Sequence, residues 1–209
     1  MSVQTGMAIQ VDNLSRHFGQ KTIFQGVSFR FDGPGLFGIT GSNGKGKTSL
    51  LKILCGFARP NGGTVRWARS GVEIELDQLS QVASLSGPYI DLPDYLRLDE
   101  LIRLHEKMLG HRFRETKRSE VLDMAGLSAH KQQFIQDFSS GMKQRVRLML
   151  TFLTDVPFWL LDEPSSNLDA AGFEFYSHNI RQEKNIRLIL VASNQPESEL
   201  IGATSMYEL

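Results

Sequence analysis

The sequence has almost no cysteine, no excess of charge of either sign and no long apolar run, and each absence narrows the possible functions. Cys55 is the only cysteine in 209 residues, so no disulfide can form within the chain, which fits a reducing compartment. The 23 basic and 23 acidic residues cancel, so no long-range field attracts nucleic acid or an anionic membrane. No apolar run reaches the ~20 residues that a membrane span needs. We therefore expect a chain that does not cross a membrane and binds no nucleic acid.

Apolar patterns along the chain predict one α/β domain, residues 1–209, with a helical insert. Strand patterns fall at residues 8–11, 27–31, 36–39, 64–67, 72–76, 82–85, 158–161 and 187–191, with a last edge strand expected at 203–207. The early strands alternate apolar and polar residues, and the alternation of strands with helices along the chain implies a parallel sheet with covered faces. Helical spacing dominates residues 87–153. We expect a core at 1–86 and 154–209 with the helical subdomain between.

A glycine-rich loop between a predicted strand and a predicted helix indicates phosphate binding. It matches G-x-x-x-x-G-K-[ST] at every fixed position, with the residues Gly41, Ser42, Asn43, Gly44, Lys45, Gly46, Lys47 and Thr48. Glycines let successive backbone N–H groups turn toward phosphate oxygens, and the helix N-terminus adds partial positive charge. We expect Lys47 to reach the β- and γ-phosphates of ATP and Thr48 to offer its hydroxyl to Mg²⁺. The alternative is a glycine-rich turn that contains lysine by chance.

Two carboxylates follow an apolar strand, as the second half of such a site requires. The run Phe158–Leu161 is followed by Asp162 and Glu163. Mg²⁺ prefers oxygen ligands and keeps several waters, so one carboxylate, Asp162, suffices to hold it. Glu163 is the candidate to orient or deprotonate the attacking water. The alternative is a solvent-exposed pair at a strand end.

The order of these motifs resembles the ATPase subunit of ABC transporters over nearly the whole chain. Between the loop at 41–48 and the acidic strand end lies the string Phe138-Ser139-Ser140-Gly141-Met142-Lys143-Gln144-Arg145. It is similar to the family's signature motif, usually L-S-G-G-Q. Here Ser139 and Gly141 are retained, whereas Phe138, Ser140 and Met142 replace Leu, Gly and Gln. The resemblance implies a mostly parallel P-loop core with an antiparallel N-terminal sheet and a helical insert. The length, the single-domain plan and the run Gly41-Ser42-Asn43-Gly44 are similar to the ATPase subunit of the cytochrome c haem-export complex. The strings at 139–145 and 192–195 are more similar to small bacterial ATP-binding subunits of poorly assigned substrate.

The resemblance implies a head-to-tail dimer, with itself or a paralogous subunit, that encloses two ATP molecules. The loop of one subunit, extended by Ser49, then faces the signature residues of the other: Ser139, Ser140, Gly141 and Met142. Asp169, which ends the string Ser166-Asn167-Leu168-Asp169, lies at the dimer interface. Phe18 stacks on adenine; the alternative is an ordinary core phenylalanine.

The resemblance also implies separately encoded membrane subunits, and hence a cytoplasmic protein peripheral to the inner face of the membrane. A coupling helix of such a partner would dock on the segment near Gly87–Leu92 and on Tyr95. Two other interpretations stay open: a soluble non-transport ABC protein, and a weakly hydrolysing regulatory subunit.

Two departures from the family pattern predict slow hydrolysis. Ser86-Gly87-Pro88 stands where the family has a Gln, and Asn194, beside Ser193, falls at the place of its His. An Asn or Ser hydrogen-bonds phosphate but does not carry a charge or shuttle a proton. None of the five histidines is placed to substitute. We still expect an ATPase, because Glu163 is intact.

Overall fold

A computed structural model describes residues 6–209, and they form two compact units. The first contains the chain up to Leu85 together with Pro157–Asp162 and Glu183–Leu209. The second contains Ser86–Val156 and Glu163–Gln182. The second unit therefore adds residues 163–182 to the predicted insert 87–153. Each unit is described in its own terms below.

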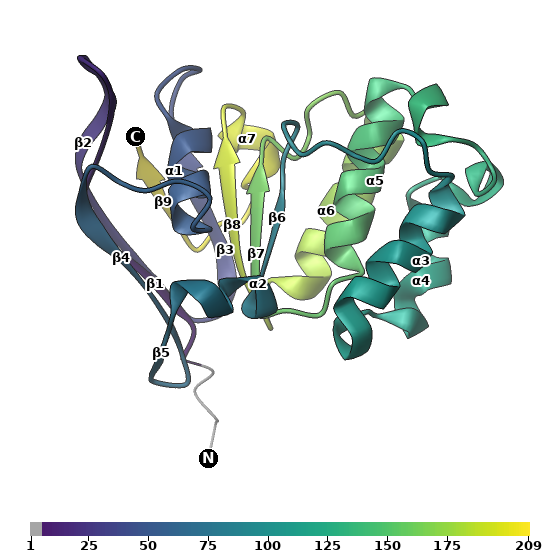
Figure 1. Cartoon of the computed structure of the whole chain (residues 1–209), viewed down its shortest axis with the longest axis horizontal. Coiled ribbons are helices and arrows are strands. Elements are labelled where there is room, and N and C mark those ends of the chain that lie inside the picture. Colours follow the sequence, from purple (N-terminus) through teal and green to yellow (C-terminus); the bar gives the residue numbers. More distant parts are fainter. Residues whose placement is uncertain (1–5) are drawn as a thin grey trace. The chain divides into compact units, whose positions relative to one another are not determined.

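The first unit holds a five-stranded sheet of order β6-β7-β8-β3-β9 (Figure 1). Its strands are β3 (Gly35–Thr40), β6 (Ala83–Ser86), β7 (Phe158–Asp162), β8 (Leu188–Ser193) and β9 (Ser205–Glu208). β3 pairs in parallel with β8 and β9, and β7 pairs in parallel with β8. β7 and β8 are buried along their whole length, as their uninterrupted apolar sequences require. The carboxyl ends of β3, β7 and β8 therefore share one edge.

A second, antiparallel sheet has the order β2-β1-β4-β5. Its strands are β1 (Ala8–Phe18), β2 (Lys21–Asp32), β4 (Gly62–Arg69) and β5 (Val72–Ile74). β1 extends beyond the predicted residues 8–11, because its ladder with β2 continues through register shifts to the pair Phe18↔Lys21. The shift near Asn13, whose φ is +48°, breaks the alternation on which the prediction rested. The mixed α/β class with an antiparallel N-terminal sheet is confirmed.

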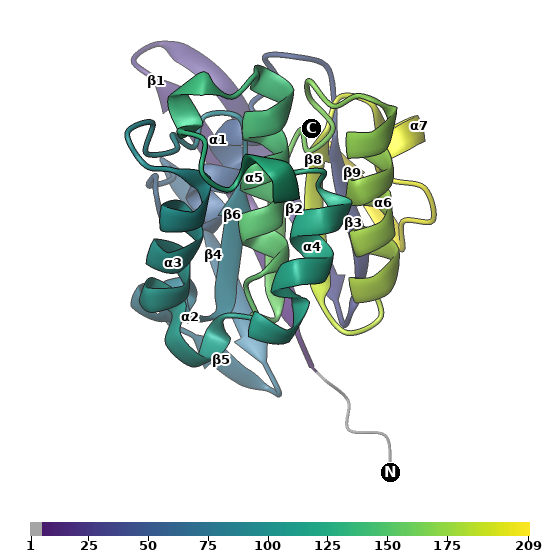
Figure 2. The same ribbon diagram turned by 90° about the vertical axis from the view of Figure 1, so that its right-hand side faces the viewer.

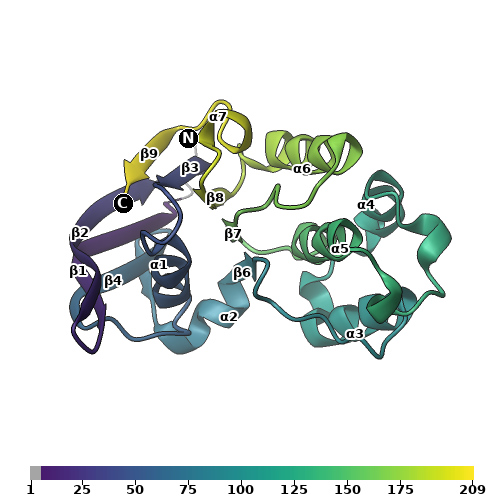
Figure 3. The ribbon, with the colours of Figure 1, turned by 90° about the horizontal axis from the view of Figure 1, so that it is seen from above.

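Helix α1 (Lys47–Leu54) lies between these two sheets, as the view from above shows (Figure 3). Leu50, Leu51 and Leu54 are fully buried in one core cluster with side chains of both sheets. Trp67 of β4 contacts Phe158 of β7 edge to face, with ring centroids 4.8 Å apart, and its indole N–H donates to the Leu54 carbonyl at 3.2 Å. This packing fixes the C-terminal end of α1 against β4 and β7.

The second unit is helical. Its main helices are α3 (Leu98–Leu109), α4 (Arg118–Met124), α5 (Ser140–Phe152) and α6 (Ala170–Glu183), and α3, α4 and α5 run alongside one another in Figure 2. Phe152 and Phe175 join α5 to α6 through an edge contact at 5.3 Å. The first unit also contains two one-turn helices that were not predicted, α2 (Leu79–Val82) and α7 (Pro196–Glu199). Across residues 6–209, no helix has the length and apolar character that a membrane span requires.

Candidate functional site

The glycine-rich loop joins the end of β3 to α1 and holds the amine of Lys47 in its curve. Lys47 is 4% exposed, and its Nζ donates to the carbonyl of Gly41 at 2.8 Å and to that of Ser42 at 3.4 Å. A buried ammonium needs such acceptors. The charge is therefore held inside the loop by backbone oxygens.

Gly46, at the start of α1, is fixed by both conformation and contact. Its φ is +99°, which favours glycine, and an added Cβ would lie 2.5 Å from Cγ2 of Ile23 and 3.0 Å from Cδ1 of Phe24. The loop backbone thus rests directly on β2. No side chain of the described chain caps the N-terminus of α1, so this end of the helix has the character of an anion site.

Thr48 and Asp162 are brought together from positions far apart in the sequence. The Thr48 hydroxyl donates to Oδ2 of Asp162 at 2.6 Å, and Asp162 is 1% exposed at the end of β7. A hydroxyl and a carboxylate are oxygen donors of the kind that Mg²⁺ takes. Within residues 6–209, no group of three or more His, Cys, Asp or Glu side chains is arranged for a metal ion. A cation here would therefore need further ligands from a substrate and water.

Glu163 follows β7 with an unusual backbone conformation. Its φ is +44°, in the left-handed region that costs a non-glycine residue free energy. Its carbonyl accepts from the N–H of Ser166 at 3.1 Å, which closes a turn directly after the strand. Such strain is common at functional positions, which makes Glu163 a candidate by its geometry as well as by its sequence context.

The end of β8 reaches the glycine-rich loop through Asn194. Its Nδ2 donates to Oδ1 of Asn43 at 2.9 Å, while the fully buried Ser193 accepts from the N–H of Gln195 at 2.9 Å. Of the two residues predicted at this position, Asn194 contacts the loop and Ser193 shapes the following turn. The sequence analysis did not anticipate the contact with Asn43.

Phe18 ends β1 at the tip of the β1–β2 hairpin and is 57% exposed. The alternative of a core phenylalanine is therefore wrong. The guanidinium carbon of Arg16 lies 4.2 Å from the centroid of its ring. Cys55, by contrast, packs against the core, and burial raises the pKa of its thiol to about 12, so it stays protonated and unreactive.

A second group of predicted residues gathers in the helical unit, at the start of α5. Ser139 is the N-cap residue of α5, and its hydroxyl accepts from the N–H of Met142 at 3.2 Å. The helix begins at Ser140. An added Cβ on Gly141 would lie 2.7 Å from the carbonyl oxygen of Asn167. This glycine is thus where the signature segment meets the loop that leads to Asp169.

Two residues further along α5, Gln144 and Arg145, bind that loop, which the sequence motifs alone did not indicate. Gln144 is 1% exposed, and its Nε2 donates to the carbonyl of Pro164 at 3.0 Å. Arg145 forms an ion pair with Asp169 and donates to the carbonyl of Ala125 at 3.1 Å. Asp169 also accepts from the N–H of Gly172 at 2.8 Å. The N–H of Gly172 and the guanidinium of Arg145 lower the pKa of Asp169, so this carboxylate is charged.

Two basic residues of α5 hold the segment that was predicted to dock a partner. Nε of Arg147 donates to the carbonyl of Ile90 at 2.7 Å, and Nζ of Lys143 pairs with Asp94 at 3.0 Å. Tyr95 is 75% exposed beside them. The segment is therefore anchored to the signature helix and still presents an aromatic ring to solvent.

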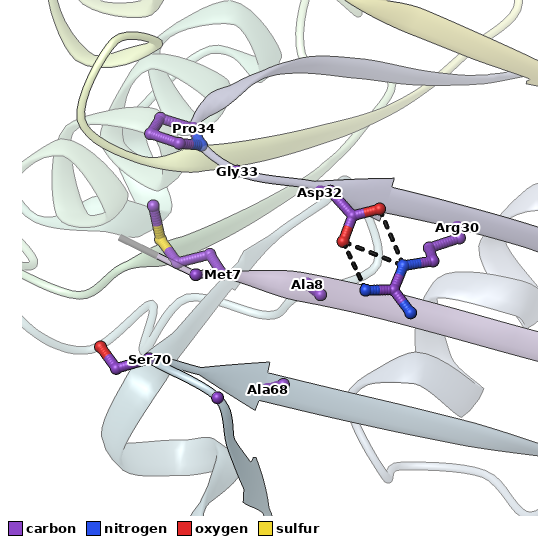
Figure 4. Close-up of a pocket in the computed structure, with 10 residues that line it drawn as sticks. Met7, Ala8, Arg30, Asp32, Gly33, Pro34, Ala68 and Ser70 are labelled. Carbon is purple, nitrogen blue, oxygen red and sulfur yellow. Dashed lines mark hydrogen bonds and ion pairs between the residues drawn. The ribbon is translucent and has the colours of Figure 1, made fainter. Parts of the chain in front are cut away.

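A pocket of about 790 Å³ lies elsewhere in the first unit. It is lined by residues at the start of β1, the end of β2 and the residues before β3, including Met7, Gly33 and Pro34 (Figure 4). Its charged lining residues, Arg30 and Asp32, pair with each other at 2.8 Å. No predicted site residue lines it, and it adjoins the N-terminal end of β3 whereas the glycine-rich loop follows the carboxyl end.

Comparisons with known proteins agree with this geometry. A family model described as ABC transporter matches residues 24–166. The cytochrome c biogenesis ATP-binding export protein CcmA of Nitrosospira multiformis is 30% identical over an alignment of 195 residues. The alignment covers 88% of this chain and 90% of that protein. The protein of the same name from Escherichia coli K12 is 31% identical over 179 residues, or 85% and 84% of the two chains. A solved ATP-binding subunit of an ABC transporter superposes with a TM-score of 0.83 at 22% identity over 96% of this chain and 85% of the other, a likeness that shows the fold.

Proposed function

This chain belongs to the ABC transporter family as one of its ATP-binding subunits, and we propose that it binds ATP at Gly41–Thr48 and hydrolyses it with Glu163 as the base. The contact that carries the proposal is the hydrogen bond of 2.6 Å between Thr48 and Asp162. It joins the glycine-rich loop to the acidic strand end, the two halves that a P-loop ATPase needs.

Lys47 supplies charge to the bound phosphates. Its ammonium donates to two carbonyls of its own loop, and phosphate oxygens are stronger acceptors because they are charged. A triphosphate in the loop would replace these contacts. Backbone N–H groups around it would come from the rest of the loop and the start of the helix, namely Ser42, Asn43, Gly44, Lys45, Gly46 and Ser49. The ammonium of Lys47 then needs no other counter-charge, because the negative charge of the triphosphate compensates it.

Mg²⁺ fits the pair Thr48 and Asp162, since both offer oxygen ligands. When bound with the triphosphate, the ion neutralises charge on the β- and γ-oxygens. Glu163, next to Asp162 in the chain, orients the attacking water and accepts its proton. The strained turn at Glu163 (φ +44°) supports this role, because its conformation is not one that the local sequence alone would adopt.

The signature group completes the site of a second subunit. We propose that Ser139, Ser140, Gly141 and Met142 contact the γ-phosphate held by the partner, using the N-terminal end of α5. Asp169 lies at the same interface. Its ion pair with Arg145 fixes the loop that carries it, so the dimer forms on a preset surface.

The membrane partner docks on residues 88–95. This segment offers Pro88, Tyr89, Ile90, Leu92 and Tyr95, and α5 anchors it through Arg147 and Lys143. The curated relatives are named export proteins, which favours a transporter subunit over a soluble factor acting on ribosomes or DNA. The protein would sit at the inner face of the membrane through its partner.

Hydrolysis is slow in this proposal. Asn194 holds the place of the family's His and is hydrogen-bonded to Asn43, and no Gln stands at Ser86–Pro88. A weakly hydrolysing subunit that acts mainly as an ATP-gated clamp is the second candidate, and this contact is the observation that favours it.

Three proteins test the proposal: wild type, Glu163→Gln and Lys47→Ala. ATP binding is measured by calorimetry with Mg²⁺, and phosphate release is measured at steady state. We expect wild type and Glu163→Gln to bind ATP equally, only wild type to hydrolyse it, and Lys47→Ala to bind much more weakly. Equal inertness of wild type and Glu163→Gln, with ATP still bound, would establish the clamp. No binding by wild type would refute both candidates.

A further inference from the structure

The ring of Phe18 is covered on one face and open on the rest of its surface. The guanidinium carbon of Arg16 lies 4.2 Å from the ring centroid, whereas Phe18 is still 57% exposed. Arg16 and Phe18 are two apart on β1, so their side chains leave the strand on the same side. A large aromatic ring kept at the surface with a cation behind it has the form of a stacking platform.

Arg16 is itself held in place by the turn after α1. Its Nη1 donates to the carbonyl of Arg59 at 2.7 Å. One residue along, the N–H of His17 donates to Oδ1 of Asn61 at 2.8 Å. These two hydrogen bonds tie the end of the hairpin to residues 59–61. The guanidinium is thus fixed at one end by a carbonyl while its carbon lies over the ring.

This hairpin lies beside the glycine-rich loop. Arg16 is paired with Phe24 in the β1–β2 ladder, and Phe24 is one of the two β2 residues against which Gly46 packs. The loop backbone, the strand β2 and the Arg16–Phe18 pair therefore form a continuous series of contacts. The resemblance places adenine on Phe18, and these contacts join the strands that carry Arg16 and Phe18 to the loop proposed to hold the phosphates.

We propose that Arg16 is a positioning residue that backs Phe18, so that a purine base stacks on the opposite face of the ring. The inference rests on the proposed function and on the expected stacking of adenine on Phe18, and it adds Arg16 as the residue that holds the ring. An exposed phenylalanine loses side-chain freedom when a ligand stacks on it. Arg16 holds the ring before the ligand arrives, so less side-chain entropy is lost when the base stacks, and only one face of the ring stays open. Arg16 acts on the base only through Phe18.

The test compares two ligands that differ in whether they carry a base. Affinities for Mg²⁺–ATP and for inorganic tripolyphosphate are measured by calorimetry on wild type, Arg16→Met, Phe18→Ala and the double variant. Arg30→Met is the matched control, since Arg30 is also an exposed arginine of the same sheet but pairs with Asp32. Thermal melts confirm folding. If Arg16→Met does not fold, Arg16→Lys, which lacks the planar guanidinium, takes its place.

We expect Arg16→Met to weaken ATP binding by about threefold and Phe18→Ala by roughly tenfold, with no change for tripolyphosphate. The double variant should match Phe18→Ala, because Arg16 has nothing to act on once the ring is gone. Arg30→Met should bind both ligands as wild type does.

Other results overturn the inference in distinguishable ways. Equal weakening for both ligands would make Arg16 a general electrostatic contributor. Unchanged ATP binding in Arg16→Met, or additive losses in the double variant, would show that Arg16 does not act through the ring. If wild type binds neither ligand, the proposed function fails. If wild type binds both ligands and neither substitution changes the affinities, the proposed function stands and only the roles of Arg16 and Phe18 in base stacking are refuted.

Discussion

Nδ2 of Asn194, at the end of β8, donates to Oδ1 of Asn43 in the glycine-rich loop at 2.9 Å. The family's His at this place can carry a charge and exchange a proton, whereas the amide of Asn194 only donates and accepts hydrogen bonds. The amide is therefore bound to the loop beside the site where the γ-phosphate is proposed to lie.

Asn194→His should raise the steady-state rate of ATP hydrolysis by roughly tenfold, because it restores an imidazole that can stabilise charge and help position the water. Phosphate release at saturating ATP measures it. Asn194→Ala is the control, since it breaks the bond to Asn43 and adds no imidazole. A gain in both variants would mean that the contact with Asn43 itself restrains the loop, and a gain in neither would show that Asn194 does not limit the rate of hydrolysis.

Gly141→Ala should abolish hydrolysis while a single subunit still binds ATP. The new Cβ would lie 2.7 Å from the carbonyl of Asn167, which is too close, so the signature segment or the loop to Asp169 must shift. The glycine-rich loop, where ATP is proposed to bind, belongs to the first unit and keeps its contacts. Gly62→Ala is the matched control, because its nearest neighbour would be 4.0 Å away. Calorimetry and phosphate release are compared. Full activity in Gly141→Ala would contradict the proposed role of this segment.

The ion pair between Arg187 and Glu183 allows a test of how burial changes the contribution of an ion pair to stability. Arg187 and Glu183 are 2.6 Å apart with side chains 6% and 8% exposed, and Arg187 lies over the ring of Trp159 at 4.9 Å. Arg187→Met should lower the free energy of unfolding by about 3 to 5 kcal/mol, because it leaves a buried carboxylate without its cation.

The control for that substitution is an exposed pair of the same length. Arg181 and Glu174 are also 2.6 Å apart, but their side chains are 59% and 66% exposed. Arg181→Met should cost less than about 1 kcal/mol. Urea unfolding of both variants gives the comparison, and similar losses would show that burial does not decide the effect.

His105 should make the stability of the helical unit depend on pH. Its Nε2 lies 3.0 Å from the carbonyl of Leu150 and 3.0 Å from the hydroxyl of Thr154, and burial lowers its pKa below the ordinary 6.5. As the pH falls below about 6.5, His105 in the unfolded chain therefore binds a proton that it does not bind in the folded chain. The contribution of His105 is complete above pH 6.5 and is lost as the pH falls through the lower folded pKa, at no more than about 1.4 kcal/mol per pH unit.

Thermal melts between pH 5 and 8 measure this effect, with His105→Gln as the comparison. The variant keeps an amide donor of similar reach but has no proton to gain, so its melting temperature should fall less on acidification. Parallel curves for the two proteins would assign the pH dependence to other groups.

The strands and helices that position the site were predictable where one local pattern dominated. β7 and β8 begin as uninterrupted apolar runs, and the glycine-rich loop carries its own spacing, so each was predicted at the right place in the chain. The long β1 was not, because its outer half is polar and is held by pairing with β2. Gln144 and Arg145 belonged to a recognised string, but their partners, Pro164 and Asp169, are about twenty residues away along the chain.

The sequence by itself determined the residue types that are proposed to bind phosphate and Mg²⁺ and the order in which they occur, because glycine, lysine and carboxylate positions encode that chemistry locally. Only the tertiary structure decided which of them meet: that Thr48 lies on Asp162, that Asn194 bonds to Asn43, and that Arg16 backs the exposed ring of Phe18. Such contacts depend on how sheets and helices pack, and the free energy of packing belongs to no single segment.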